Sequence, residues 1–160
     1  MGCGDTVRWL YRLDEDFVWP SPFPVSHDVA FQDAEGQTRL LITTDGTITV
    51  LKGYAWDGCT PKVCFLDLLV GTPDGAVYEG TGRPKTYYAS LVHDALYQFL
   101  PDDLPLKRSQ CDECFLRLMR RDRFALRYLY YVAVRLFGGL TRPVTRRIRR
   151  TYGARRIELT

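Results

Sequence analysis

Long apolar runs are missing from this sequence: no stretch approaches the roughly 18 residues that a membrane-spanning helix needs. The first residues also lack the basic and then apolar pattern of a secretory signal. The first absence excludes a transmembrane segment, and the second favours a cytoplasmic protein. Because cytoplasmic thiols stay reduced and the five cysteines are an odd number, we expect no disulfide framework.

Four of the cysteines form two close pairs, Cys59 with Cys64 and Cys111 with Cys114. Together they could supply four ligands to a structural zinc ion, which is often held by paired cysteines. Paired zinc ligands usually lie in turns, whereas Cys111 and Cys114 fall within a helical pattern. We therefore expect small buried thiols rather than a structural zinc site.

The length of 160 residues and the hydrophobic content of 46% are enough for one sizeable core. The chain is too short to make two domains the default, so we expect a single domain over residues 1–160. Strands are expected mainly in residues 1–52, a site loop and connection in residues 53–85, and helices in residues 86–153.

Alternation of apolar and polar residues in the first third of the chain is typical of β-strands. The pattern predicts strands over residues 6–13, 25–31, 39–44 and 48–51, with an extended proline-rich loop over residues 19–24. The Asp45-Gly46 pair predicts a tight hairpin between the last two strands. The first third is therefore predicted to be an antiparallel meander.

Apolar residues at helical spacing dominate the second half. They predict helices over residues 86–99, 109–122 and 124–137, and a short basic helix from Thr141 to near Gly153. Thr86 is placed to cap the first of these helices. An antiparallel β meander packed on a C-terminal bundle of three to four helices is an α+β fold.

Charge is divided unevenly along the chain, although its net value is only +3. Residues 107–156 hold 15 of the 22 basic residues and 3 of the 19 acidic ones. Such a basic end indicates an anionic partner, whether nucleic acid, a lipid headgroup or an acidic protein surface. The candidate contacts are Arg146, Arg147, Arg149 and Arg150. An equally simple alternative is a solvated face that balances the acidic half of the molecule.

The first predicted helix carries an unusual set of polar side chains. Ser90, His93, Asp94 and Tyr97 form one stripe beside its apolar face. A solvated face would carry lysine, glutamate and arginine, whereas these four groups can hydrogen-bond one another or bind a metal. The stripe is therefore a candidate site. The alternative is that His93 and Asp94 only hydrogen-bond to loops that pack over the helix.

A carboxylate interrupts the apolar stripe of the next predicted helix. Asp112 falls beside Phe115 and Met119, where it needs a partner. Consecutive helices joined by a short proline-bounded loop are usually antiparallel neighbours, so we predict that His93 and Asp112 are in contact. The alternative is a capping box, because Ser109 and Asp112 have the spacing of one.

The segment from Gly53 to Pro61 is a candidate site loop. Its glycines permit unusual backbone angles, and Asp57 supplies a carboxylate. The alternative is a simple Asp-Gly turn.

Four groups of residues resemble the ordered landmarks of the DUF1353 family. They are Gly53-Tyr-Ala-Trp-Asp57-Gly-Cys-Thr60-Pro61, Ala89-Ser-Leu-Val-His93-Asp94-Ala-Leu-Tyr97, Cys111-Asp112-Glu-Cys-Phe115 and Tyr131-Val-Ala-Val-Arg135-Leu-Phe-Gly138. That family occurs in bacteriophages and prophages, so the resemblance implies a phage or bacterial origin. It implies synthesis in the host cytoplasm and association with the virion as one outcome, but no particular chemistry.

The His93-Asp94-x-x-Tyr97 helix followed by Asp112 on a second helix is similar to the phospholipase A2 superfamily. The resemblance implies that His93 is a base that deprotonates water, that Asp112 orients it and that Tyr97 supports the pair. It also implies that Asp94 binds calcium. The glycine-rich calcium loop of that superfamily is missing, so Asp57 would have to supply further calcium ligation.

Two classes of function remain open from the sequence. One is a hydrolase that cleaves a lipid ester or another bond of the bacterial envelope, with calcium assisting. The other is a non-catalytic phage protein, such as a tail or capsid accessory protein or a host-takeover protein. In the second class the same residues hold the fold, and the arginine-rich end binds an anionic or protein partner.

Overall fold

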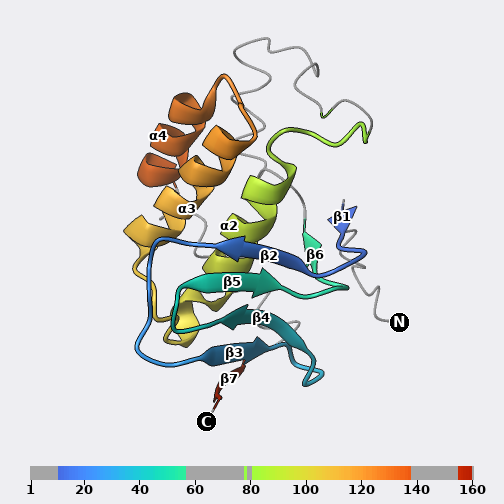
Figure 1. Cartoon of the computed structure of the whole chain (residues 1–160), viewed down its shortest axis with the longest axis vertical. Helices are drawn as coiled ribbons and strands as arrows, with labels where there is room; N and C mark the ends of the chain where they lie inside the picture. The colour runs from blue at the N-terminus through green and yellow to red at the C-terminus, as the bar shows by residue number, and fades with distance from the viewer. Residues whose placement is uncertain (1–10, 57–77, 79–80, 138–154, 160) are drawn as a thin grey trace, which may run out of the picture.

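The computed structural model describes residues 11–56, 78, 81–137 and 155–159. It places strands in the N-terminal part and helices in the C-terminal part, which confirms the α+β prediction (Figure 1). The strands are β1 (Tyr11–Arg12), β2 (Phe17–Pro20), β3 (Val29–Gln32), β4 (Thr38–Ile42), β5 (Thr47–Val50), β6 (Ala55–Trp56) and β7 (Arg155–Glu158). The helices are α2 (Tyr87–Phe99), the 3-10 turn η1 (Leu100–Asp102), α3 (Arg108–Arg121) and α4 (Arg127–Phe137).

Five strands form an antiparallel sheet in the order β2-β5-β4-β3-β7, and β1 pairs separately with β6. The predicted hairpin joins β4 to β5. The Asp45 carboxylate accepts hydrogen bonds from the Thr43 hydroxyl (2.6 Å) and the Thr47 amide (3.0 Å). Every second residue of the two strands is buried, which gives one apolar face: Leu40, Ile42, Ile48 and Val50.

Three strands differ from the sequence expectation. β6 lies within the segment predicted to be a site loop, and it pairs with β1. Residues 19–24 were predicted to be a loop, but β2 extends to Pro20 and pairs with β5. Because β2 is an edge strand, one of its sides has no neighbouring strand, and a residue without an N–H is tolerated there. β7 was not predicted, and it forms the opposite edge beside β3.

The helices are stacked outward from the sheet (Figure 1). α2 packs on β4 and β5, α3 packs on α2, and α4 packs on α3. α4 was predicted to begin at Phe124, but it begins at Arg127. Thr86 precedes α2 as predicted, but its side chain makes no capping hydrogen bond. Within the described ranges, no helix has both the length and the apolar character needed to cross a membrane.

Candidate functional site

His93 and Asp112 meet between α2 and α3. The two helices run antiparallel, so that Tyr97 lies near the start of α3 and His93 lies one turn further along it. His93 Nε2 is 3.3 Å from Asp112 Oδ1, which confirms the contact predicted from the sequence. Both side chains are buried, and that of Asp112 is 0% exposed.

Asp112 accepts hydrogen bonds from two further side chains. The Tyr97 hydroxyl donates to Oδ1 (2.5 Å), and Arg135 Nη1 donates to Oδ2 (3.2 Å). The alternative of a capping box between Ser109 and Asp112 is wrong. α3 begins at Arg108, and the capping box at its start is formed by Lys107 and Gln110. The Gln110 side chain accepts the hydrogen bond of the Lys107 amide (2.7 Å).

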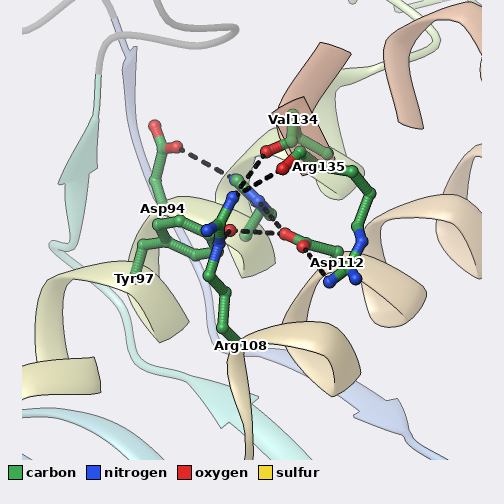
Figure 2. Close-up of polar contacts among 7 residues, drawn as sticks. Asp94, Tyr97, Arg108, Asp112, Val134 and Arg135 are labelled. Carbon is green, nitrogen blue, oxygen red and sulfur yellow. Dashed lines mark hydrogen bonds and ion pairs between the residues drawn. The ribbon is translucent and has the colours of Figure 1, made fainter. Parts of the chain in front are cut away.

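Arg108 ties this cluster to the end of α4 (Figure 2). Its Nε donates to the Tyr97 hydroxyl (3.1 Å), and its Nη2 donates to the backbone oxygens of Val134 (3.2 Å) and Arg135 (2.9 Å). These oxygens lie in the last turns of α4, where carbonyl groups lack helical partners. A cation there also interacts favourably with the helix dipole.

Sequence reasoning missed Arg108 and Arg135 as parts of the site. A signal was present for Arg135, because Arg127 and Arg135 are the only charges in an otherwise apolar and aromatic helix. A charge in such a segment is a candidate partner for a carboxylate on a neighbouring helix, and Arg135 pairs with Asp112. Arg108 carried no comparable signal, since an arginine at the start of a helix is ordinarily solvated.

Two aromatic rings pack against the imidazole of His93 and restrict its orientation. Its centroid lies 4.1 Å from that of Tyr97 and 4.8 Å from that of Phe115. An ionised carboxylate only accepts hydrogen bonds, so Nε2 carries the proton in the contact with Asp112. When the ring is neutral, Nδ1 is therefore the nitrogen with a free lone pair.

Asp94 lies on the Nδ1 side of the ring. Its Oδ1 is 3.8 Å from Nδ1, and its side chain is 20% exposed, compared with 0% for Asp112. His93 thus lies between a buried carboxylate that holds Nε2 and a more accessible carboxylate beside Nδ1. This places the four residues His93, Asp94, Tyr97 and Asp112 together, as expected from their spacing.

The electrostatics of the pair favour its ionised form. Burial by itself lowers the pKa of His93, but the hydrogen bond with Asp112 and the nearby carboxylate of Asp94 outweigh it and raise the pKa above its usual value. Burial by itself raises the pKa of Asp112, but hydrogen bonds from His93, Tyr97 and Arg135 lower it below its usual value. Burial and the neighbouring Asp112 raise the pKa of Tyr97, so its hydroxyl stays a donor.

Ser90 belongs to the predicted stripe but not to this cluster. Its hydroxyl accepts a hydrogen bond from Trp56 Nε1 (3.2 Å) and donates one to the Tyr87 backbone oxygen (2.9 Å). Ser90 therefore fastens β6 to α2. Its polarity is explained by the fold.

Metal binding has limited support from the described residues. Calcium takes six to eight oxygen ligands, and no three His, Cys, Asp or Glu side chains of the described part surround a common point. Asp94 alone is not a calcium site, and Asp57 lies outside the described residues. Cys111 and Cys114 are buried free thiols, and burial raises the pKa of Cys114 to about 12.

Several predicted residues cannot be placed. Cys59 and Cys64, and the anion-binding candidates Arg146, Arg147, Arg149 and Arg150, lie outside the described residues. The predicted basic helix from Thr141 to near Gly153 lies outside them as well. The predictions about these residues therefore stay predictions.

Comparison of the chain with models of known protein families, with curated proteins and with solved structures finds no match. The resemblances drawn from the sequence therefore stay predictions. The geometry around His93 is the feature of the chain that bears on its function.

Proposed function

We propose that this protein is a hydrolase in which His93 is the general base and Asp112 orients it. The observation that supports this most is the contact of His93 Nε2 with a fully buried carboxylate. The contact fixes the tautomer and leaves Nδ1 to accept a proton from water. Tyr97 and Arg135 hold Asp112 in place, and they are positioning residues because they act through it.

The reaction proposed is hydrolysis of an ester, as the similarity to phospholipase A2 implies. His93 Nδ1 accepts a proton from water while the water oxygen bonds to the carbonyl carbon. The tetrahedral intermediate then loses the alcohol, and the imidazolium returns the proton to the leaving oxygen. The products are an alcohol and a carboxylic acid, and His93 is neutral again. Asp112 keeps its charge throughout and stabilises the imidazolium.

The lipid or envelope substrate, the phage or prophage origin and the calcium ion are parts of the same proposal. Calcium would polarise the ester carbonyl, and Asp94 would be one of its ligands. The described residues give it no complete ligand set, so the reaction above is written without it. Activity with and without added calcium tests that part separately.

A second candidate function is a non-catalytic phage protein, of the virion or of host takeover. It is favoured by the burial of Asp112, whose two oxygens both have partners within the protein. A network satisfied in this way also serves simply to fix three helices against one another. Under this proposal the arginine-rich end binds nucleic acid, another anionic partner or a phage structural protein.

The test is ester hydrolysis by the full chain, with a fluorogenic soluble ester and with phospholipid vesicles as substrates. His93→Ala should abolish the activity, and Asp112→Asn should lower kcat by on the order of a hundredfold because the base loses its orientation. His27→Ala is the matched control, since His27 is the other histidine of the chain and lies in the segment before β3.

Two results would speak against the hydrolase. One is an absence of hydrolysis on both substrates, with and without calcium. The other is an activity that survives in His93→Ala. The first result would leave the non-catalytic function, for which the same variants should lower only the stability. The second would show that His93 is not the general base.

A further inference from the structure

The outward side of α4 carries large apolar side chains that nothing in the described structure covers. Tyr128, Leu129, Val132 and Leu136 are all exposed, and Leu136 is 68% exposed. Their spacing places them on one stripe of the helix, opposite the buried Tyr130 and Val134. Four neighbouring exposed apolar groups on one helix are typical of a docking surface. We call these four residues the α4 stripe.

Arginines border the α4 stripe. The guanidinium groups of Arg120 and Arg127 lie 5.5 Å and 5.0 Å from the centre of the Tyr128 ring. Arg120 also donates a hydrogen bond to the Tyr128 hydroxyl (3.2 Å). Arg135, near the other end of the stripe, is 43% exposed but paired with Asp112. The positive charge beside the apolar groups therefore comes mainly from Arg120 and Arg127, at the Tyr128 end of the helix.

Acidic side chains neutralise only part of this side of the molecule. Of the six arginines in α3 and α4, Arg117 pairs with Glu113, Arg121 with Asp122 and Arg135 with Asp112. Arg120 and Arg127, the two arginines beside Tyr128, form no ion pair within the described residues. The occupant of the α4 stripe must therefore tolerate or prefer a positive surface. A second copy of the chain would bring two such surfaces together, which like-charge repulsion opposes.

We propose that the α4 stripe binds the surface of a lipid bilayer that contains anionic lipids. Leucine and valine side chains enter the boundary between headgroups and acyl chains, and tyrosine suits that boundary because its ring is apolar and its hydroxyl polar. Arginines on the flanks extend along the surface and pair with lipid phosphates. This proposal does not depend on the hydrolase, because binding is measured without any reaction.

The test is co-sedimentation of the full chain with vesicles of phosphatidylcholine, alone or mixed with phosphatidylglycerol. We expect binding to the mixed vesicles, weakening as salt is added, and little binding to phosphatidylcholine alone. The double variant Val132→Asp/Leu136→Asp should bind at least about tenfold more weakly, since it removes two apolar groups and adds two negative charges. His93→Ala should bind like the wild type, which separates this proposal from the hydrolase.

Two controls match the variants in chemistry but not in place. Val18→Asp changes another exposed apolar residue, 57% exposed on β2, and should bind like the wild type. Arg120→Gln/Arg127→Gln should weaken binding to the mixed vesicles, whereas Arg12→Gln/Lys52→Gln should not. Apart from His93, which is buried, and Arg127, which is half-buried, the substituted residues are exposed. Circular dichroism spectra that match that of the wild type would show that each variant is folded.

Three outcomes would overturn the proposal. The first is no binding of the wild type to the mixed vesicles. The second is full binding by Val132→Asp/Leu136→Asp, which would assign lipid binding to arginines elsewhere in the chain. The third is a dimer in sedimentation equilibrium that only this double variant dissociates, which would make the α4 stripe an interface between two copies.

Discussion

At Asp112, donors from three side chains converge on a single carboxylate with no exposed surface. Loss of one partner leaves the other groups buried and unpaired, and such losses cost more than the pair contributes. Asp112→Asn should therefore lower the free energy of unfolding by about 1–3 kcal/mol in addition to its effect on activity.

Tyr97→Phe isolates one of these donors. The change removes the hydroxyl that donates to Asp112 Oδ1 and accepts from Arg108, while the ring beside His93 stays. We expect a loss of about 1 kcal/mol in the free energy of unfolding and a fall of up to about tenfold in kcat. Urea unfolding and steady-state kinetics measure the two effects.

Tyr54→Phe is the matched control, because the Tyr54 hydroxyl donates to the Gln98 side chain (2.9 Å), which is not part of the cluster around Asp112. It should cost similar stability and leave kcat unchanged. Equal loss of kcat in both variants would show that Tyr97 acts only on stability.

The pH dependence of stability follows from the opposite pKa shifts of the pair. The pKa of His93 is raised in the folded chain, so its contribution is complete below about pH 6.5 and is lost as the pH rises through the raised value. The pKa of Asp112 is lowered, so its contribution is present above about pH 4 and is lost as the pH falls through the lowered value. His93 and Asp112 together therefore stabilise the folded chain most between about pH 4 and about pH 6.5.

Urea unfolding of the wild type and of His93→Gln at several pH values checks this. The difference in the free energy of unfolding between the wild type and His93→Gln should become smaller above about pH 6.5. Activity should change in the opposite direction, because general-base catalysis needs neutral His93. A stability difference that grows between pH 6.5 and 9 would contradict the assigned direction of the His93 shift.

At the scale of elements, the spacing of apolar residues along the sequence predicted the strands and helices that depend mainly on neighbouring residues. The alternation around the Asp45-Gly46 turn gave β4 and β5, and helical spacing gave α2 and α3 almost to the residue. It also placed His93 and Asp112 on facing sides of neighbouring helices. Arg108 and Arg135 were missed because each reaches the site from a helix end whose position depends on tertiary packing.

The turn between β4 and β5 has a tertiary contact that the local sequence pattern did not predict. Gly46 has a positive φ (+87°), as a tight turn requires, and so has Gly36 (+77°) between β3 and β4. A Cβ at Gly46 would lie 2.7 Å from the Phe23 backbone oxygen, whereas one at Gly36 would meet nothing within 4 Å. The sequence predicted the turn, but not the segment of the β2–β3 connection that packs against it.

We therefore expect Gly46→Ala to destabilise the protein more than Gly36→Ala. Both changes place an alanine in the left-handed region, at a cost of about 1 kcal/mol or more. Gly46→Ala also forces the chain at Phe23 to move, so its loss in the free energy of unfolding should exceed that of Gly36→Ala by at least about 1 kcal/mol. Equal losses in chemical denaturation would show that the contact with Phe23 yields easily.

For the whole molecule, the helices stack outward from the sheet in sequence order, but the sheet itself is completed from the far end of the chain (Figure 1). β7 pairs with β3 over four residues, from Val29 with Glu158 to Gln32 with Arg155. More than a hundred residues separate the two strands. Neither alternation nor turn chemistry indicates a partner so distant, so β7 could not be predicted locally.

Removal of residues 155–160 tests how far the sheet depends on this last strand. Without β7, β3 becomes an edge strand whose backbone amides and carbonyls face solvent beside the buried Val29 and Phe31. We expect the free energy of unfolding to fall by about 1–3 kcal/mol and the shortened chain to self-associate through β3. Urea unfolding and sedimentation velocity at several concentrations measure both effects.

Removal of Thr160 alone is the control, because it leaves every pair between β3 and β7 in place. A shortened chain as stable and as monomeric as the control would show that β4 and β5, together with α2, hold β3 without its outer neighbour.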